Sequence, residues 1–199
     1  MKKWLFAGTL LFPIWFACGS SQGNNAGHSD TTALADTLGP RTEIRNEDRP
    51  SPQKVTTGLI DQVKVTVTYG SPATKGRKIW GELVPWNEVW RSGANETTTM
   101  EFSAPVLVAG QPLPAGKFGF FTLPSQDGEW TLIFNAQWDT WGAYDYKEGE
   151  DALRARVRPV FQDQMAERLD FFIEKNGIRF RWEYMDLFIP IQKAPSPAR

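Results

Sequence analysis

Histidine and cysteine are almost absent from this sequence, which has one of each among 199 residues. His28 lies in a polar segment before the predicted domain, so that domain contains no histidine. Ser-His-Asp and Cys-His nucleophile systems are therefore excluded, as are zinc and iron sites built from histidine. Cys18 has no second cysteine with which to form an intrachain disulfide. We expect no cofactor and no metal site.

An excess of positive charge is also lacking. The chain has 22 Lys and Arg against 23 Asp and Glu, a formal net charge of −1. No basic patch of the kind that displaces counterions from nucleic acid is visible, so nucleic acid is not an expected partner. A membrane-spanning apolar run is missing as well, because the run Trp4–Ala17 has 14 residues and a spanning helix needs about 20.

The N-terminus instead has the pattern of an export signal. Two lysines precede the apolar run Trp4–Ala17, which predicts a signal peptide over residues 1–17. The run ends in a small residue followed by Cys18, which resembles a bacterial lipobox with Cys18 as the lipidated residue. Gly19 in place of Asp favours an outer-membrane destination. The alternative is an ordinary secreted protein with an incidental cysteine.

Composition divides the rest of the chain. Residues 18–54 are rich in Gly, Ser, Asn, Asp, Thr and Pro, which predicts a disordered polar tether with a typical reach of roughly 35 Å. A domain is expected over residues 55–193, followed by a Pro-rich tail over 194–199. The tether and the lipidated Cys18 would hold this domain near a membrane of the cell envelope.

The domain reads as short alternating strands. Val63, Val65, Val67 and Tyr69 fall on one face, the pattern of a half-buried strand. Further strands are expected at 98–102, 106–108, 117–123, 130–135, 153–158, 168–175, 178–184 and 187–191.

Turn residues join these strands. A hairpin is predicted around residues 125–128, and another with a positive-φ turn at Asn176-Gly177. Residues 162–168 are compatible with one helical turn. We predict an all-β fold, an antiparallel β-sandwich or jelly-roll-like single domain with one long irregular loop.

That loop, Tyr69–Thr99, is the first candidate for a functional site, because long loops without periodicity are often functional. In one interpretation Arg91 pairs with Glu96 or Glu82 and fixes the loop to the sandwich. In the other, the loop and a second aromatic loop containing Trp138, Trp141, Tyr144 and Tyr146 line a cleft for an anionic or hydroxylated ligand. The candidate binding residues are Arg77, Trp90, Arg91, Asn95, Glu96, Asn135, Trp141 and Tyr144.

Carboxylates offer the remaining chemistry. A glycosidase needs two of them at a suitable separation, and Glu82, Glu88, Glu96 and Asp145 are available. The acidic residues of 145–151 do not have the spacing of an EF-hand loop, which favours a solvated acidic loop.

Several motifs in order resemble one known family. They are Lys75–Pro85, Val89–Glu96, Leu113–Gly116, Phe121–Pro124, Trp130–Asn135, Trp141–Tyr146 and Arg181–Glu183. Over residues 50–192 the chain resembles the family called domain of unknown function 2911. The resemblance implies an exported, often lipid-anchored bacterial envelope protein, common in the Bacteroidetes, and implies no particular activity.

Three functions remain open on the sequence. The first is a non-enzymatic, lipid-anchored envelope module that binds a polysaccharide or a protein partner through loops at one end of the sandwich. The second is a histidine-free hydrolase that uses carboxylates on glycans. The third is a structural envelope component without a ligand.

Overall fold

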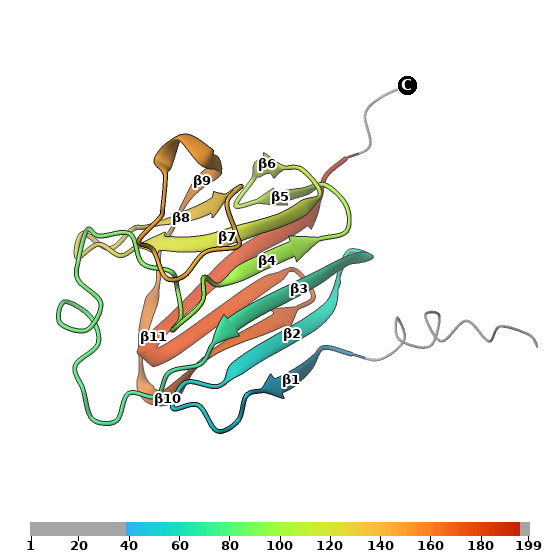
Figure 1. The fold of residues 1–199 in the computed structure, drawn as a ribbon. Helices are drawn as coiled ribbons and strands as arrows, with labels where there is room; N and C mark the ends of the chain where they lie inside the picture. The colour runs from blue at the N-terminus through green and yellow to red at the C-terminus, as the bar shows by residue number, and fades with distance from the viewer. Residues whose placement is uncertain (1–38, 196–199) are drawn as a thin grey trace, which may run out of the picture. The chain divides into compact units, whose positions relative to one another are not determined.

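The computed structural model describes residues 39–195, which form two antiparallel sheets packed as a sandwich (Figure 1). The predicted all-β sandwich is thereby confirmed. The predicted signal peptide, Cys18, His28 and most of the Pro-rich tail lie outside the described residues. Within residues 39–195 the one helical element is the 3₁₀ helix η1 (Glu148–Glu150), and no helix there is long and apolar enough to cross a membrane.

The seven-stranded sheet has the order β1-β2-β3-β4-β7-β8-β9, and the four-stranded sheet has the order β10-β11-β5-β6. The strands are β1 (Arg41–Arg45), β2 (Gln53–Ile60), β3 (Val63–Gly70), β4 (Thr99–Phe102), β5 (Val106–Val108), β6 (Gln111–Leu113), β7 (Gly116–Leu123), β8 (Trp130–Asn135), β9 (Asp151–Val157), β10 (Val160–Glu174) and β11 (Gly177–Lys193).

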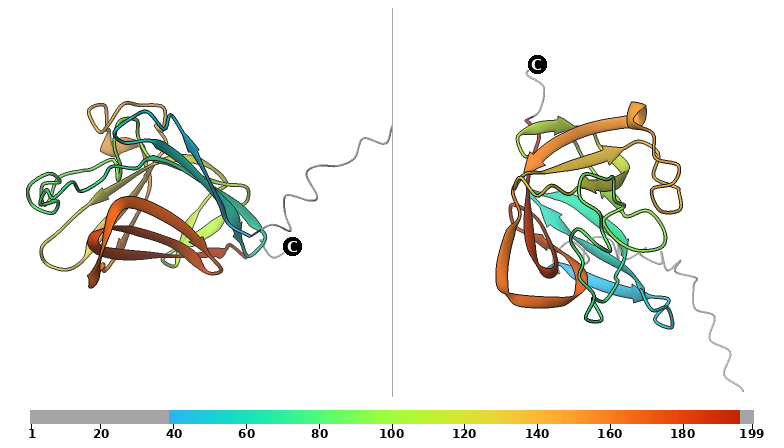
Figure 2. Two further views of the ribbon diagram at one scale, coloured as in Figure 1. Left: turned by 90° about the horizontal axis from the view of Figure 1, so that it is seen from below. Right: turned by 90° about the vertical axis from the view of Figure 1, so that its left-hand side faces the viewer.

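Alternation along the strands builds the core between the two layers, which Figure 2 shows from below. Val63, Val65, Val67 and Tyr69 of β3 are all buried, as their spacing predicts. Facing residues of β11, such as Phe180, are buried on the opposite layer. Because both inner faces are apolar, burial of their side chains provides the main driving force for packing the sheets.

Two strands begin within the segment that the sequence assigns to the tether. β1 and the start of β2 lie inside the segment 18–54 that composition assigns to a tether. β1 pairs with β2 from Arg41↔Thr57 to Arg45↔Gln53, yet all five of its residues are exposed. A strand that is held by backbone pairing and buries no side chain leaves no apolar signal in the sequence.

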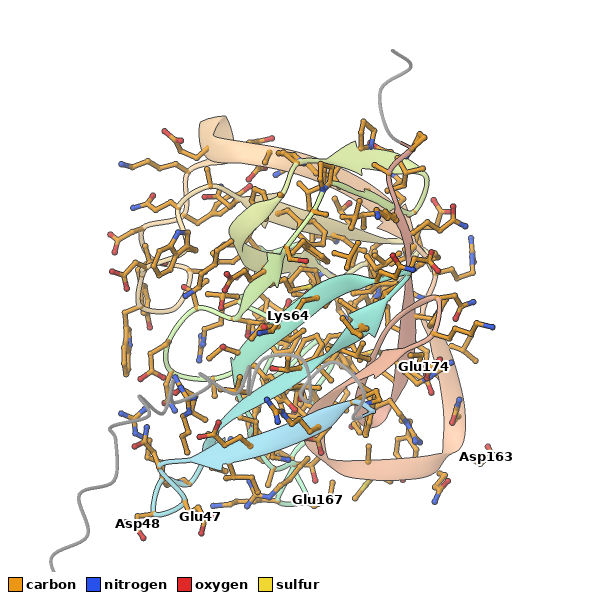
Figure 3. The ribbon with its side chains drawn as sticks, turned by 90° about the vertical axis from the view of Figure 1, so that its right-hand side faces the viewer. Glu47, Asp48, Lys64, Asp163, Glu167 and Glu174 are labelled. Atoms are coloured by element: carbon orange, nitrogen blue, oxygen red, sulfur yellow. The ribbon has the colours of Figure 1, made fainter. Side chains whose placement is uncertain are left out.

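β10 is longer than predicted, and it replaces the expected helical turn. Residues 162–168 lie within this strand, which pairs with β11 from Val160↔Asp186 to Glu174↔Gly177. Almost all of its first half is exposed, and Asp163 projects outward from the curve of the strand (Figure 3). An exposed edge strand needs no alternation, so periodicity could not identify it.

The β10–β11 hairpin is confirmed, but its turn differs from the prediction. Glu174 pairs with Gly177, so Lys175 and Asn176 form the turn, and neither of them has a positive φ. Gly177 is required for a different reason. A Cβ there would lie 2.4 Å from the Ile189 carbonyl oxygen, because β11 bends sharply near Glu183 (φ 53°) and folds back beside its own start.

Candidate functional site

The long loop between β3 and β4 leaves the seven-stranded sheet and first follows the edge of the other one. The Thr74 N–H donates to Glu167 O at 2.8 Å, and the Leu169 N–H donates to Pro72 O at 3.0 Å. Arg77 then holds this turn together, since its Nη2 donates to Ala73 O at 2.7 Å. Arg77 is thus a clamp on the local backbone, and the structure does not bring it to the other predicted site residues.

The middle of the loop places the rings of Trp80 and Trp90 between the sheets, and we call these two residues the tryptophan plug. The Trp80 ring lies 4.7 Å from that of Trp130 in β8 and 6.0 Å from that of Trp182 in β11. Trp90 stacks on Trp182 at 5.8 Å and on Phe180 at 6.0 Å. Trp90 is 9% exposed, so the structure places this predicted site residue between the sheets and apart from the exposed rings. A ring that contacts both sheets is part of the core.

The last part of the loop completes the edge of β7. β4 is short and pairs with β7 only from Phe102↔Gly116 to Thr99↔Gly119. Beyond it, Trp90 and Thr122 exchange two backbone hydrogen bonds at 2.9 Å, and the Phe120 N–H donates to Thr98 O at 2.7 Å. The irregular segment 90–98 therefore satisfies backbone groups that a longer strand would otherwise have to satisfy.

The second aromatic loop, residues 136–150 between β8 and β9, meets the long loop at this segment. The Gly142 N–H donates to Asn95 O at 3.1 Å, and the Thr97 N–H donates to Thr140 O at 3.1 Å. The Thr97 hydroxyl also donates to Gly142 O at 2.7 Å. The two loops are thus joined by main-chain contacts over residues 95–97 and 140–142, which fixes the backbone on both sides of Trp141.

A polar cluster anchors the far end of the second loop. Asp151 accepts hydrogen bonds from Asn135 Nδ2, Tyr146 Oη and Arg154 Nε, each at 2.7 Å. Burial, reinforced by the hydrogen bond to the Asp151 carboxylate, raises the pKa of Tyr146 to about 12. Asn135, a predicted binding residue, is 1% exposed and also holds Lys147 O at 2.9 Å. Its amide is thus used within the fold, where it anchors the second loop.

The predicted ion pair of Arg91 with Glu96 or Glu82 does not form. Glu96 instead accepts from Arg49 Nη1 at 2.7 Å, and Glu82 pairs with Lys78 at 3.1 Å on the surface. Within residues 39–195 no carboxylate lies within 4 Å of the Arg91 guanidinium, and its buried Nε has no hydrogen-bond acceptor.

The pKa values of Arg91 and Glu96 are both shifted by their surroundings. Burial lowers the pKa of Arg91 below its ordinary value, although nearby Tyr144 acts in the opposite direction. Burial raises the pKa of Glu96, but hydrogen bonds from Arg49 and from its own backbone, with the charge of Arg49, hold the net pKa below its ordinary value. Glu96 Oε2 is buried without a donor in the described residues. Most buried polar atoms in folded proteins have a hydrogen-bond partner, so Arg91 Nε and Glu96 Oε2 are exceptions to that rule among the described residues.

The second aromatic loop, which meets the segment that holds these groups, carries exposed aromatic rings. Trp138, Trp141 and Tyr144 are 38%, 56% and 86% exposed. Lys117 Nζ lies 3.8 Å above the Trp138 ring, a cation–π contact that orients this indole. Tyr144 and Arg91 both lie next to Gly142, since a Cβ there would be 3.1 Å from the tyrosine ring and 3.8 Å from Arg91 Nη1. We call Arg91, Asn95, Glu96, Trp138, Trp141 and Tyr144 the loop surface.

The loop surface contains five of the eight predicted binding residues. It also contains Trp138, which is not among those eight. Arg77, Trp90 and Asn135 lie elsewhere, for the reasons given above. The sequence offers one indication of Trp138, namely its membership of the second aromatic loop. It offers none for Arg49, which falls in the predicted tether. It also offers none for Lys117, whose contact with the Trp138 ring is visible only in the structure. Within residues 39–195 no group of three or more His, Cys, Asp or Glu side chains is placed to hold a metal ion.

The fold and the loop surface define a class: a β-sandwich whose irregular loops carry exposed aromatic rings beside an arginine. A family described as protein of unknown function (DUF2911) matches residues 51–191. The chain belongs to this family. No curated protein and no solved structure shows significant similarity to it.

Proposed function

We propose that this chain is a non-enzymatic binding module that recognises a polysaccharide through the loop surface. One observation carries the proposal. Trp141 and Tyr144 are held in solvent by a loop whose backbone is fixed beside Arg91, and the arginine has no partner among the described residues. Aromatic faces pack against the apolar faces of sugar rings, and a few polar groups nearby orient the ligand.

The polar groups suit hydroxyls better than a purely anionic ligand. Arg91 contributes guanidinium donors and Glu96 contributes a carboxylate acceptor, and neither residue is fully buried. A sugar with neighbouring hydroxyls can accept from the first and donate to the second. The depressed pKa of Glu96 keeps its carboxylate ionised, which suits an acceptor and is the opposite of what a general acid in a glycosidase requires.

The loop surface is also rigid enough for this role. The main-chain hydrogen bonds at residues 95–97 and 140–142 order Trp141 before any ligand arrives, and Lys117 fixes the Trp138 ring. Little ordering free energy would therefore be lost on binding.

The test is a glycan array probed with the full chain, followed by titration of each hit. Arg91→Gln and Trp141→Ala are expected to weaken binding at least tenfold, because each removes a ligand contact. Tyr184→Ala is the matched control, since Tyr184 is an aromatic residue that is 44% exposed on β11, outside the loop surface. Equal binding by all four proteins would contradict the proposal.

We further propose that the module works in the cell envelope, attached to the outer membrane through a lipid on Cys18. The support is the sequence of residues 1–19 alone. Labelled palmitate should be incorporated into the wild type, which should partition with membranes. Cys18→Ser should abolish incorporation and release the protein into the soluble fraction, and unchanged membrane retention would count against the anchor.

A further inference from the structure

A hollow lies at the opposite end of β8 from the loop surface. It has a volume of about 500 Å³ beside the turn between β7 and β8, whereas the second aromatic loop follows the other end of the same strand. Its apolar lining comes from Trp86, Trp130, Pro159 and Phe161, with Arg158 at one side. This volume is in the range of small-molecule sites.

Two glycines shape the hollow. Gly81 (φ 86°) lies against the Trp86 ring, and a Cβ there would be 2.4 Å from the indole Nε1. Gly128 (φ 96°) lies against Arg158, where a Cβ would be 2.5 Å from Nη1. Trp130 is fixed as well, because its Nε1 donates to Ser125 O at 3.1 Å. Contacts within the protein therefore fix the positions of Trp86, Trp130 and Arg158 around the hollow.

The hollow contains the positive charge of Arg158 and no carboxylate among its lining residues. Arg158 is the one charged residue among those that line it, and within residues 39–195 no carboxylate oxygen lies within 4 Å of its guanidinium. Asp127 and Glu129 line an adjoining hollow of about 310 Å³, which shares Ser125 and Arg158 with the first. Glu129 already faces Arg156, at 3.9 Å. A cation beside an apolar floor favours a ligand that is both apolar and anionic.

We propose that this hollow binds a small aromatic anion. The flat ring of the ligand packs against Trp86 and the half-exposed ring of Phe161, which is 54% exposed, and its carboxylate or sulfonate pairs with Arg158. The arginine fork suits two oxygens of one acidic group. The site is independent of the glycan surface, because the two share no residue.

The test compares two fluorescent probes on the full chain. 1-Anilinonaphthalene-8-sulfonate is an aromatic anion, and N-phenyl-1-naphthylamine is its neutral counterpart without the sulfonate. The wild type should bind the anion with saturation and about tenfold more tightly than the neutral probe. Arg158→Gln should remove that preference by weakening the anion about tenfold. The affinity of the neutral probe should stay within twofold.

Three further variants keep the test specific. Arg156→Gln removes the neighbouring charge on β9 and should leave both affinities unchanged, as should Arg91→Gln on the loop surface. Phe161→Ser removes apolar lining and should weaken both probes. Each variant is accepted only if its melting temperature matches the wild type. Absence of saturable binding, or an anion preference that survives in Arg158→Gln, would overturn the proposal whether or not any glycan binds.

Discussion

Trp90 and Arg91 are neighbours in the chain but belong to two different regions of the long loop. Up to Trp90 the loop carries Trp80 and Trp90, whose rings pack between the sheets and are almost fully buried. From Arg91 onward it contributes to the loop surface, where Trp141 and Tyr144 are exposed and Arg91 has no partner within residues 39–195. The first region buries the rings of Trp80 and Trp90 in the core, whereas the second leaves the rings of Trp141 and Tyr144 in solvent.

This difference separates two uses of aromatic residues. In the plug, indole rings contribute apolar area to the core, and their loss would leave cavities. On the loop surface, indole and phenol rings face water while the backbone beneath them is fixed by hydrogen bonds. Rings that are ordered but not buried have no structural purpose that the described residues reveal, which is why we assign them to a ligand.

The largest expected effect is on stability and comes from the plug. Trp90→Ala should lower the free energy of unfolding by about 3–5 kcal/mol, because it opens a cavity between Trp182 and Phe180. Trp141→Ala should change it by less than about 0.5 kcal/mol, as expected for an exposed side chain. Urea denaturation of both variants measures the contrast, and similar losses in the two would erase the distinction between the regions.

A second prediction concerns the anchored end of the second loop, where Asp151 pairs with Arg154 at 2.7 Å. Asp151→Ala should cost about 2–4 kcal/mol, since it leaves Asn135, Tyr146 and Arg154 without their shared acceptor. Arg156→Ala, on the same strand but 76% exposed at its side chain, is the control and should cost less than about 0.5 kcal/mol. Thermal denaturation would show the difference.

Arg91 should behave in the opposite way to Asp151. Arg91→Met keeps the apolar stem and removes a half-buried charge that has no partner in the described part of the chain. Stability should therefore stay within about 0.5 kcal/mol of the wild type or rise by about 1 kcal/mol. Glycan affinity should fall at the same time. A loss of more than about 2 kcal/mol would instead support the interpretation in which Arg91 fixes the loop.

The smallest effect is a pH dependence at Glu96. Because the folded-state pKa of Glu96 lies below its ordinary value of 4.5, its pairing with Arg49 stabilises the fold above that pH, and this contribution is lost as the pH falls through the folded pKa. At pH 7 the wild type should exceed Glu96→Gln by about 0.2–1 kcal/mol. The gap should close in acid, and a gap that widens below pH 4.5 would contradict the assignment.

The sequence predicts those parts of the fold that bury a periodic pattern. The alternation of Val63–Tyr69 identifies β3, and the turn residues at 125–128 identify the β7–β8 hairpin. β1 and the first half of β10 were missed because they pair through the backbone and bury almost no side chains. Nothing local distinguishes such strands from polar loops.

The candidate site was predicted less well, because spacing cannot show burial. Trp90 and Trp141 are both tryptophans in aromatic segments, yet Trp90 lies between the sheets and Trp141 is exposed to solvent. The proximity of Arg91 and Glu96 in sequence suggested an ion pair, but Glu96 binds Arg49, which is 47 residues away. The meeting of the two aromatic loops was foreseen from their composition, and main-chain contacts at residues 95–97 confirm it.

The central claim is that the loop surface, and not the tryptophan plug, binds a polysaccharide. The most direct measurement is titration of one glycan hit against the wild type, Arg91→Gln and Trp141→Ala, with melting temperatures recorded for all three. The account predicts that both variants lose at least tenfold in affinity while their melting temperatures stay within about 2 °C of the wild type. Unchanged affinity in both variants would contradict it.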